Sequence, residues 1–545
     1  MRHCRSTGDM FSFGPKGVKV ASVETITDKP RTSEQKPPVE TELKLLVAVE
    51  RFAAFRESAL QRLSARNKGI IRRLDAIYFD TPEHALFDAG LTLRVRRTGR
   101  SFTQTVKRTA SNGALSRHEW ESPVHAMAPD LGSLPLLEIG APFDKLDPQS
   151  LVPAFATNVR RHALMVDVPG AQIEVAFDDG KVEAGAWQQP ISEVELELKQ
   201  GRPAALYELG LSLMETEPLR LGVQTKSDRG YALACIKTPK AFKATQSGIG
   251  RDDIVDDAIA ALLANCHQQI LANLVPAELS EVPDGVHQLR VGLRRLRTLL
   301  WLLRHEIGAP ALAALEAEAK QLASNLGPAR NWEVFISSTI ANLEMVELED
   351  IDFSGLRMAA HPFRDEAYVK VREVLASPEV NRFLLSLGLV IEQRNWRNDI
   401  SAGTLGVLSE PVGKLGARVL GRIERKALKL GRHFRHLAPE QRHKVRITLK
   451  KLRYALEFFL PLYAGHGATG KYLKRLSHLQ DSLGAENDIA TSRELLHQLT
   501  EATTDPGVHR AIGAVAGWQR CYQIGKADQL LSDWKNFERQ PLFSD

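Results

Sequence analysis

The segment Val39-Glu40-Thr41-Glu42-Leu43-Lys44-Leu45 alternates charged side chains with mostly apolar ones. Successive side chains of a β-strand point to opposite faces, so a strand here places Glu40, Glu42 and Lys44 on one face and the mostly apolar set on the other. A face with three charges is stable in bulk water, or inside a polar cavity that other strands of the same kind enclose. Alternation alone indicates only a half-buried strand, so the cavity needs complementary charged strands elsewhere in the chain.

Complementary strands do follow. Predicted strands at 91–97, 102–107 and 191–198 carry Arg94, Arg96, Lys107, Glu193, Glu195 and Glu197. Three carboxylates on one face of a strand repel each other, and a hard divalent cation such as Mg²⁺ or Mn²⁺ relieves that repulsion. Acidic and basic strands around one interior therefore predict a closed barrel that holds a metal on one side and an anion on the other. Solvent-exposed strand faces explain each segment separately, but not the sorting of acids and bases into different strands.

The composition is ordinary for a globular protein. The chain has 545 residues, 43% apolar and 25% charged, with a net charge of +6, and its length suggests about two to four domains. The four cysteines lie far apart without a Cys-x-x-Cys pair, which argues against a disulfide framework and fits a reducing compartment. The chain contains no run of about 18 apolar residues, so no transmembrane helix is expected. Residues 1–37 lack the apolar core of a secretory signal and predict a disordered leader.

Several segments together resemble the CYTH family, also called triphosphate tunnel metalloenzymes. They are Val39-Glu40-Thr41-Glu42-Leu43-Lys44, Gly90-Leu91-Thr92-Leu93-Arg94-Val95-Arg96, Thr105-Val106-Lys107 and Glu193-Val194-Glu195-Leu196-Glu197. The resemblance runs from about residue 38 to 240. It implies an antiparallel β tunnel that hydrolyses triphosphate-bearing substrates with Mg²⁺ or Mn²⁺.

The resemblance also implies roles by position. The implied metal ligands are Glu40, Glu42, Glu193 and Glu195, with Asp178 and Glu197 as further candidates. The implied phosphate-binding residues are Lys44, Arg94, Arg96, Lys107 and Arg161, to which Arg117, Lys226 and Arg229 are added. The catalytic set is Glu40, Glu42, Lys44, Arg94, Arg96 and Lys107. Cations must neutralise the triphosphate before a nucleophile approaches, and a metal lowers the pKa of a bound water for in-line attack.

Residues 237–250 are polar and contain proline and glycine, which predicts a linker to a helical second half, 251–535. That half contains an internal repeat. The two copies are His287-Gln288-Leu289-Arg290-Val291-Gly292-Leu293-Arg294-Arg295-Leu296-Arg297 and His443-Lys444-Val445-Arg446-Ile447-Thr448-Leu449-Lys450-Lys451-Leu452-Arg453. Each copy places a cationic face beside a leucine-rich stripe. The faces consist of His287, Arg290, Arg294 and Arg297, and of His443, Arg446, Lys450 and Arg453.

A second motif follows each copy at a matched distance. Leu326-Gly327-Pro328-Ala329-Arg330-Asn331 begins 39 residues after His287, and Leu483-Gly484-Ala485-Glu486-Asn487-Asp488 begins 40 residues after His443. These pairs predict two duplicated four-helix-like units. They resemble the CHAD domain, the conserved histidine α-helical domain, over roughly 250 to 535, which implies binding of inorganic polyphosphate by a basic surface. Asn331 and Glu333 stand where that family usually has aspartates, so the first turn is expected to be looser than the second.

The charge density of this half favours an anionic partner. Residues 414–453 contain 14 Lys and Arg against two acids, a density that attracts polyanions and binds them by releasing their counterions. Aromatic residues for base stacking are sparse there, so inorganic polyphosphate is preferred over nucleic acid. His287 and His443 are interpreted as hydrogen-bond donors to phosphate or as packing residues, because no neighbouring His or Cys completes a metal site.

The expected class is α+β and multidomain, with an antiparallel β tunnel at 38–236, an all-α duplicated helical bundle at 251–535 and a tail at 536–545. The expected function is hydrolysis of inorganic triphosphate to pyrophosphate and phosphate in the cytoplasm, including at polyphosphate granules, without a membrane partner. Thiamine-triphosphate hydrolysis, adenylate cyclisation and a non-catalytic polyphosphate-binding scaffold are the alternatives.

Overall fold

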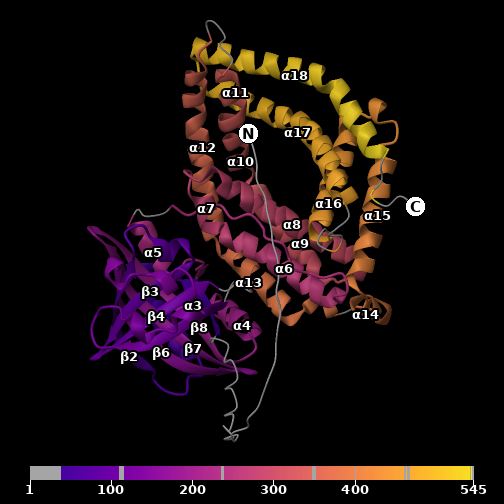
Figure 1. The fold of residues 1–545 in the computed structure, drawn as a ribbon. Coiled ribbons are helices and arrows are strands. Elements are labelled where there is room, and N and C mark those ends of the chain that lie inside the picture. The colour runs from indigo at the N-terminus through magenta and orange to yellow at the C-terminus, as the bar shows by residue number, and fades with distance from the viewer. Residues whose placement is uncertain are drawn as a thin grey trace, which may run out of the picture. The chain divides into compact units, whose positions relative to one another are not determined.

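The computed structural model describes residues 39–109, 116–234, 238–345, 351–398, 400–459, 462, 467–539 and 542. The predicted leader at 1–37 lies outside these residues. Strands fill the first half of the described chain and helices the second, which confirms the predicted α+β class (Figure 1).

The strands form one antiparallel sheet that closes on itself. In the described residues they are β1 (Val39–Leu46), β2 (Ile70–Asp80), β3 (Leu91–Thr98), β4 (Ser101–Thr109), β5 (Ser116–Val124), β6 (Val152–Val168), β7 (Ala171–Ala184), β8 (Trp187–Gly201) and β9 (Arg220–Leu221). Their order is β5-β4-β3-β2-β6-β7-β8-β1-β9, and β5 also pairs with β1. That pairing closes the barrel, because β1 bonds β5 through its first residues and β8 from Glu42 onward.

The two faces of β1 have opposite surroundings. Leu43 and Leu45 are buried in a hydrophobic cluster with residues of α1 (Phe52–Arg62) and α4 (Ala204–Leu213). Glu40, Glu42 and Lys44 line the barrel interior. Burial of each leucine contributes about 2 kcal/mol. A register slip by one residue would exchange the leucines with the charges, so this pattern fixes the register of β1.

The apolar residues of 45–67 recur at helical intervals, which predicts a helix over 45–67, but the helix in this segment, α1, spans only Phe52–Arg62. Leu45 and Leu46 remain in β1, because they pair with β8 and β9. The remaining short elements of this half are η1 (Val49–Arg51), α2 (Ala85–Asp88), η2 (Leu131–Ser133), α3 (Leu136–Ile139), η3 (Phe143–Lys145), η4 (Pro148–Ser150) and α5 (Lys226–Leu233).

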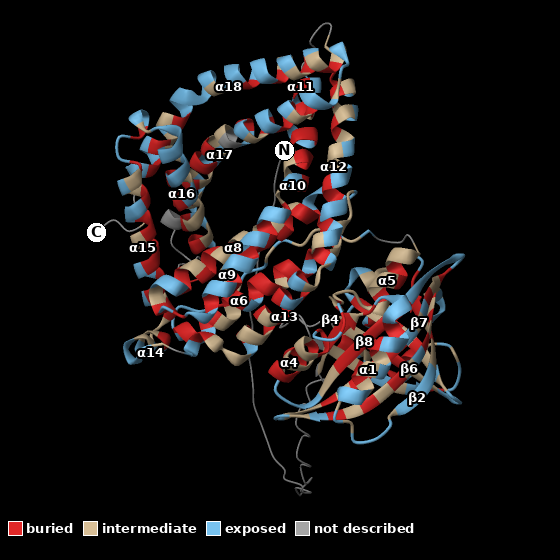
Figure 2. Cartoon of the chain, turned by 180° about the vertical axis from the view of Figure 1, so that it is seen from behind, coloured by how far each residue is buried: buried red, intermediate tan, exposed pale blue. Residues whose placement is uncertain are grey.

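The second half is helical, as predicted. Its described elements are α6 (Val255–Ala272), α7 (Leu274–Glu278), α8 (Pro283–Ile307), α9 (Ala311–Asn325), α10 (Gly327–Val334), the π-helix η5 (Phe335–Ile340), α11 (Ala341–Glu344), α12 (Phe353–Ala376), α13 (Pro378–Gln393), η6 (Asn395–Arg397), α14 (Ala402–Leu408), α15 (Val412–Leu430), η7 (Phe434–His436), α16 (Pro439–Phe459), α17 (Gly467–Ala502) and α18 (Pro506–Glu538). The two longest, α17 and α18, lie side by side, and much of α18 is exposed (Figures 1 and 2).

The repeat helices are α8 and α16, and their leucine-rich stripes are buried. The Leu-Gly motifs differ between the copies. In the first copy the motif begins α10, where Pro328 occupies the first turn and needs no hydrogen-bond acceptor. In the second copy the motif lies inside α17, which continues without a break. The chain is therefore interrupted at the first motif and regular at the second, where Asp488 lies within a helix and not in a turn.

The predicted linker has no helix or strand over its described residues 238–250, yet it is held in place. The Phe242 amide donates to Asn273 Oδ1 at 2.9 Å, and Asn273 Nδ2 donates to the Phe242 carbonyl at 2.8 Å. Asn265 Nδ2 donates to the Thr245 carbonyl at 3.1 Å. These bonds fasten the linker to the end and the middle of α6.

No single helix in the described residues combines the length and apolar character needed to cross a membrane. One bent pair, α12 with α13, passes that test of length and composition jointly.

Asp80 at the end of β2 organises the segment around α2. Its carboxylate is fully buried and accepts hydrogen bonds from the amides of Thr81, Leu86 and Phe87 at 2.8, 2.9 and 3.1 Å. It also accepts the Tyr231 hydroxyl of α5 at 2.6 Å. One buried side chain therefore ties the turn after β2 to the helix that carries Lys226.

Replacement of Asp80 by alanine is expected to lower the free energy of unfolding by about 3 kcal/mol, because buried donors lose their acceptor. Urea denaturation of the full chain measures this change. The matched control is Asp75→Ala on the same strand, which removes ion pairs with the exposed Arg73 and Arg97 and costs less than about 1 kcal/mol. Equal losses in the two variants would contradict the role assigned to Asp80.

Candidate active site and basic face

The inward side chains of the barrel line part of a cavity of about 890 Å³, whose lining also includes residues of α4, α6 and α7. Acidic and basic residues from opposite strands share this cavity. The charged lining residues include Glu40, Glu42, Lys44, Arg94, Arg96, Lys107, Glu119, Glu121, Arg161, Glu174, Asp178, Glu195, Glu197, Lys199 and Lys226. The period-two alternation of the strands therefore produces a charged interior in place of an apolar one.

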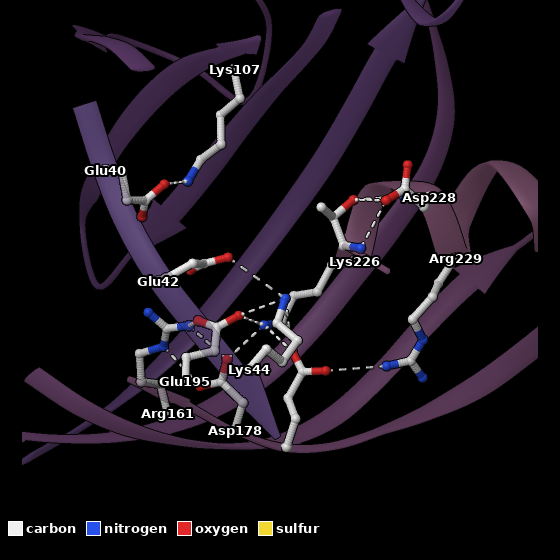
Figure 3. Close-up of polar contacts among 12 residues, drawn as sticks. Glu40, Glu42, Lys44, Lys107, Arg161, Asp178, Glu195, Lys226, Asp228 and Arg229 are labelled. Atoms are coloured by element: carbon white, nitrogen blue, oxygen red, sulfur yellow. Dashed lines mark hydrogen bonds and ion pairs between the residues drawn. The ribbon is translucent and has the colours of Figure 1, made fainter. Parts of the chain in front are cut away.

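Three buried carboxylates, Asp178 of β7 and Glu193 and Glu195 of β8, lie close together, and we call them the acidic triad. Figure 3 labels Asp178 and Glu195. One oxygen of each lies within 4.8 Å of the others. The Lys226 ammonium lies among them, 2.5 Å from Glu193 Oε1 and 2.8 Å from both Glu195 Oε1 and Asp178 Oδ2. Lys226 reaches this position because it opens α5, whose first turn is fixed by the capping box of Thr225 and Asp228.

Further cations surround the triad. Lys44 Nζ lies 3.1 Å from Glu195 Oε1 and 3.7 Å from Glu193 Oε1. Arg161 Nε donates to Asp178 Oδ1 at 2.8 Å, and its other end contacts Glu195. Arg229 Nη1 lies 3.4 Å from Glu193 Oε2. Together with Lys226, these three cations surround the triad with positive charge.

The electrostatics follow from this pairing. Burial opposes the charged form of Lys226, but Asp178, Glu193 and Glu195 outweigh it and raise the pKa of Lys226 well above its usual value. Burial likewise opposes ionisation of Glu195, but Lys226, Lys44 and Arg161 outweigh it and hold the pKa of Glu195 well below its usual value. Both partners are ionised at neutral pH.

A second group of charges lies nearer to β3, β4 and β5. Lys107 Nζ is 2.5 Å from Glu40 Oε2 and 3.2 Å from Glu119 Oε2. Arg94 lies 3.8 Å from Glu119, and Arg96 lies 3.6 Å from Glu121, so these two pairs are loose. Arg94 first, then burial, lowers the pKa of Arg96 to about 10, and Arg161 adds to that effect.

The arginine pair has the character of an anion site. Nε of Arg94 and Nε of Arg96 are buried without a hydrogen-bond acceptor among the described residues. Two crowded guanidinium groups with unused donors are stabilised by phosphoryl oxygens, which match their fork geometry.

The carboxylates fit a hard divalent cation by their chemistry. The triad supplies three oxygen donors close together. Glu197 forms a second group of carboxylates with the neighbouring Glu40 and Glu174. Burial raises the pKa of Glu197, and the negative charges of Glu40 and Glu174 raise it further. Mg²⁺ and Mn²⁺ prefer such oxygen ligands. A metal at the triad must, however, share it with Lys226 or displace it.

The sequence-predicted tunnel residues have the following places. The triad consists of Asp178, Glu193 and Glu195, and the cations that contact it are Lys44, Arg161, Lys226 and Arg229. The rest of the cavity is lined by Glu40, Glu42, Arg94, Arg96, Lys107 and Glu197. Arg117 lies opposite Glu40 in the β1–β5 pairing, and its side chain lies outside the described residues. The prediction did not include Glu119, Glu121, Glu174 or Tyr78. The alternation of Arg117, Glu119 and Glu121 was the available signal for the first two.

The helical half presents a second cationic region, on the facing sides of α8 and α16. Burial lowers the pKa of Lys450 to about 8, and Arg446 and Arg294 lower it further. Burial also lowers the pKa of Arg290 to about 10, with Arg294 and Arg330 contributing. Because charges on both helices affect one another, the first and second repeat form one region, which we call the basic face.

Arg294 lies at the centre of the basic face. Its charge lowers the pKa values of His287, Arg290, Arg446 and Lys450. No carboxylate of the described residues forms an ion pair with it, and its Nε is buried without an acceptor there. Burial, Arg330 and Arg294 lower the pKa of His287 to about 4, so this histidine is neutral at pH 7.

Other predicted members of the basic face have different surroundings. Arg297 carries a buried Nε without an acceptor in the described part of the chain, so it resembles Arg294. Arg453 pairs with Glu457 at 3.1 Å, and His443 is exposed. The prediction did not include Arg330, although it stands in the Leu-Gly motif of the first copy.

Comparison with known proteins agrees with this division. A family model of the CYTH domain matches residues 39–231, and one of the CHAD domain matches residues 261–497. An inorganic triphosphatase from Haemophilus influenzae is 35% identical over 159 residues, 29% of this chain and 44% of that relative. The match thus spans less than half of that relative's length.

Two further similarities extend over more of the chain. An uncharacterized protein from Mycobacterium tuberculosis is 26% identical over 456 residues, 80% of this chain and 84% of that protein. The crystal structure of the CHAD domain from the plant Ricinus communis covers 54% of this chain and 96% of its own, with 27% identity and a TM-score of 0.45. The matches to the two family models show that the chain contains a CYTH domain followed by a CHAD domain, the two families that its motifs resemble.

Proposed function

We propose that the CYTH domain hydrolyses inorganic triphosphate to pyrophosphate and phosphate with Mg²⁺ or Mn²⁺, and that the CHAD domain binds inorganic polyphosphate. The observation that supports the first part most strongly is the sorted lining of one cavity. Carboxylates for a metal lie at the triad and around Glu197. Across from them lie Arg94 and Arg96, each with a buried Nε that has no acceptor among the described residues. The similarity to an inorganic triphosphatase adds to this support.

Each group has a distinct task in this proposal. Arg94, Arg96 and Lys107 neutralise and orient the phosphoryl oxygens, which lowers the barrier to attack by an oxygen nucleophile. Glu40, Glu42 and Glu197, together with the triad, would hold the divalent cation. When bound, that cation withdraws charge from the phosphates and lowers the pKa of a coordinated water.

The aromatic lining favours inorganic triphosphate over thiamine triphosphate or a nucleotide. Tyr78 stacks on Phe155 with 4.5 Å between ring centroids, and Phe87 packs on Tyr231 at 4.2 Å. A third ring, Tyr207, is 4% exposed. A thiazolium or purine ring gains most of its affinity by stacking on a free aromatic face. Tyr78 and Tyr207 are buried and Phe87 is half-buried, so the phosphates supply most of the recognition.

The basic face supports the second part of the proposal. Several cations share one region with few acids, so a polyanion gains both Coulomb energy and released counterions there. A chain of phosphates uses every such cation without needing aromatic partners. We propose the cytoplasm, including polyphosphate granules, as the location, in keeping with the free thiols of Cys266 and Cys521.

Phosphate release by the full chain tests the catalytic proposal. With Mg²⁺ or Mn²⁺, triphosphate is expected to be hydrolysed with a higher kcat/KM than ATP or thiamine triphosphate. EDTA and Glu42→Ala are each expected to reduce the rate by more than about 10-fold, because metal ligands are lost. The control is Glu57→Ala, an exposed residue of α1. Absence of metal-dependent phosphate release in the wild type would leave the non-catalytic scaffold as the better explanation.

Charge reversal tests the basic face. Arg294→Glu with Lys450→Glu is expected to weaken binding of long polyphosphate and to reduce the slope of log affinity against log salt by at least about 2, because two phosphate contacts are lost. Fluorescence anisotropy at several salt concentrations measures both quantities. The control, Lys370→Glu with Arg382→Glu, changes the net charge equally on exposed parts of α12 and α13. Equal weakening of polyphosphate binding in both variants would mean that the net charge of the protein, and not the basic face, determines the affinity.

The pH dependence of polyphosphate binding follows from Lys450. Its pKa of about 8 in the free protein means that it loses its charge as the pH rises through 8. An anion binds the charged form, so affinity is expected to fall between pH 7 and 9. In Lys450→Arg the guanidinium stays charged over this range, so the fall should be smaller. Identical profiles would place Lys450 outside the contact with polyphosphate.

A further inference from the structure

The ammonium of Lys226 occupies the position that a bound cation would take in the acidic triad. Its three contacts, at 2.5 to 2.8 Å, involve one oxygen from each of Asp178, Glu193 and Glu195 (Figure 3). These are the same three residues whose oxygens converge closely enough to bind a metal ion. Lys226 therefore acts as the counter-cation of the triad in this state.

The charges around the triad are already balanced without a metal. Four carboxylates, Glu42 and the three of the triad, face the four cations Lys44, Arg161, Lys226 and Arg229. Adding a divalent cation to this balanced set creates an excess of positive charge inside a buried site. Such an addition is unfavourable unless a resident cation leaves or an anion enters.

Lys226 is the resident cation best able to leave. Arg161 is held at both ends, by Asp178 and by Glu195, and Lys44 belongs to β1, which is paired on both sides. Lys226 stands on the first turn of α5, outside the barrel strands. Tyr231 anchors the far end of α5 to Asp80, so a change of partner requires only rotation of the four-carbon side chain of Lys226.

A buried ammonium that leaves its carboxylates needs another anion, because an unpaired buried charge costs several kcal/mol. Triphosphate supplies that anion in the same cavity. We propose that Lys226 is an exchangeable internal counter-cation, which couples binding of the divalent cation to binding of triphosphate. The carboxylates released by Lys226 pass to the metal, and the ammonium passes to the phosphate. This inference rests on the proposed function and assigns Lys226 a role before the chemical step.

The coupling has a thermodynamic consequence. If triphosphate increases the affinity for the metal by some factor, the metal increases the affinity for triphosphate by the same factor. When only the metal binds, the displaced Lys226 ammonium has no anion. When only triphosphate binds and takes the ammonium, the triad carboxylates lose their cation. Each ligand by itself should therefore bind weakly, and the two together should bind tightly.

Binding measurements on the full chain test this proposal without turnover. Mn²⁺ is titrated by electron paramagnetic resonance, with and without the non-hydrolysable analogue imidotriphosphate, and thermal melting is followed under the same four conditions. In the wild type, the analogue is expected to lower the apparent Mn²⁺ dissociation constant by a factor in the usual range of about 5 to 150. The melting shift with both ligands is expected to exceed the sum of the separate shifts.

The variant Lys226→Met separates this exchange from direct contact between Mn²⁺ and the analogue, which occurs in both proteins. Without the ammonium, the triad is short of one cation, so the variant should melt at a lower temperature in EDTA and recover with Mn²⁺ alone. Its coupling factor should be smaller than that of the wild type by about 10-fold. The control is Lys181→Met, which removes an exposed lysine paired with Glu183 on β7 and should retain wild-type coupling.

The outcomes discriminate between the two proposals. If Lys226→Met folds only with Mn²⁺, loss of its structure on chelation supports the counter-cation role. Equal coupling factors in the variant and the wild type, or additive melting shifts in the wild type, would overturn that role even where triphosphate is hydrolysed. Absence of hydrolysis combined with strong coupling would instead reject the proposed reaction and retain the exchange.

Discussion

The contact between Lys226 and three buried carboxylates makes a charged barrel interior possible. Asp178 and Glu193 are fully buried, and Glu195 is nearly so, which is prohibitive for isolated carboxylates. Because Lys226, Lys44 and Arg161 satisfy them, the strands can turn polar side chains inward and apolar ones outward. The apolar set, such as Leu43 and Leu45, then packs against α1 and α4. The hydrophobic core of this domain therefore lies between the outer face of the barrel and these two helices.

The two domains present positive charge to an anion in different ways. In the tunnel, Lys107 and Lys226 have carboxylate partners at 2.5 Å, so an anion must compete for them. On the basic face, Arg294 has no ion-pair partner among the described residues, and mutual repulsion and burial depress the pKa values of its neighbours. An anion there relieves repulsion and displaces nothing. The tunnel therefore suits a small ligand that arrives with a metal, whereas the basic face suits any sufficiently long polyanion.

Much of this arrangement was predictable, because side-chain periodicity determines the face on which a residue lies. The alternation in β1, β3 and β8 predicted an interior of sorted charges, and the matched offsets in α8 and α16 predicted two basic helices. Periodicity does not determine which side chain from another strand or helix a residue contacts. Sequence therefore did not show that Lys226 fills the triad, that Arg330 reaches the basic face, or that Tyr78 is packed by Phe155. The helix expected at 45–67 was too long, because apolar spacing cannot reveal that β9 pairs with Leu45 and Leu46.

The two repeat copies show how one substitution can separate duplicated elements. Pro328 in the first Leu-Gly motif cannot donate a hydrogen bond inside a helix, so the chain ends α9 and begins α10 there. Arg330, on the first turn of α10, then adds a charge next to Arg290 and His287. The second motif lacks proline and stays within α17, and the acidic Asp488 lies close enough to affect Arg446 and Lys450. Each end of the basic face therefore has an acid close to its cations, Asp284 beside His287 and Arg330 in the first copy and Asp488 beside Arg446 and Lys450 in the second.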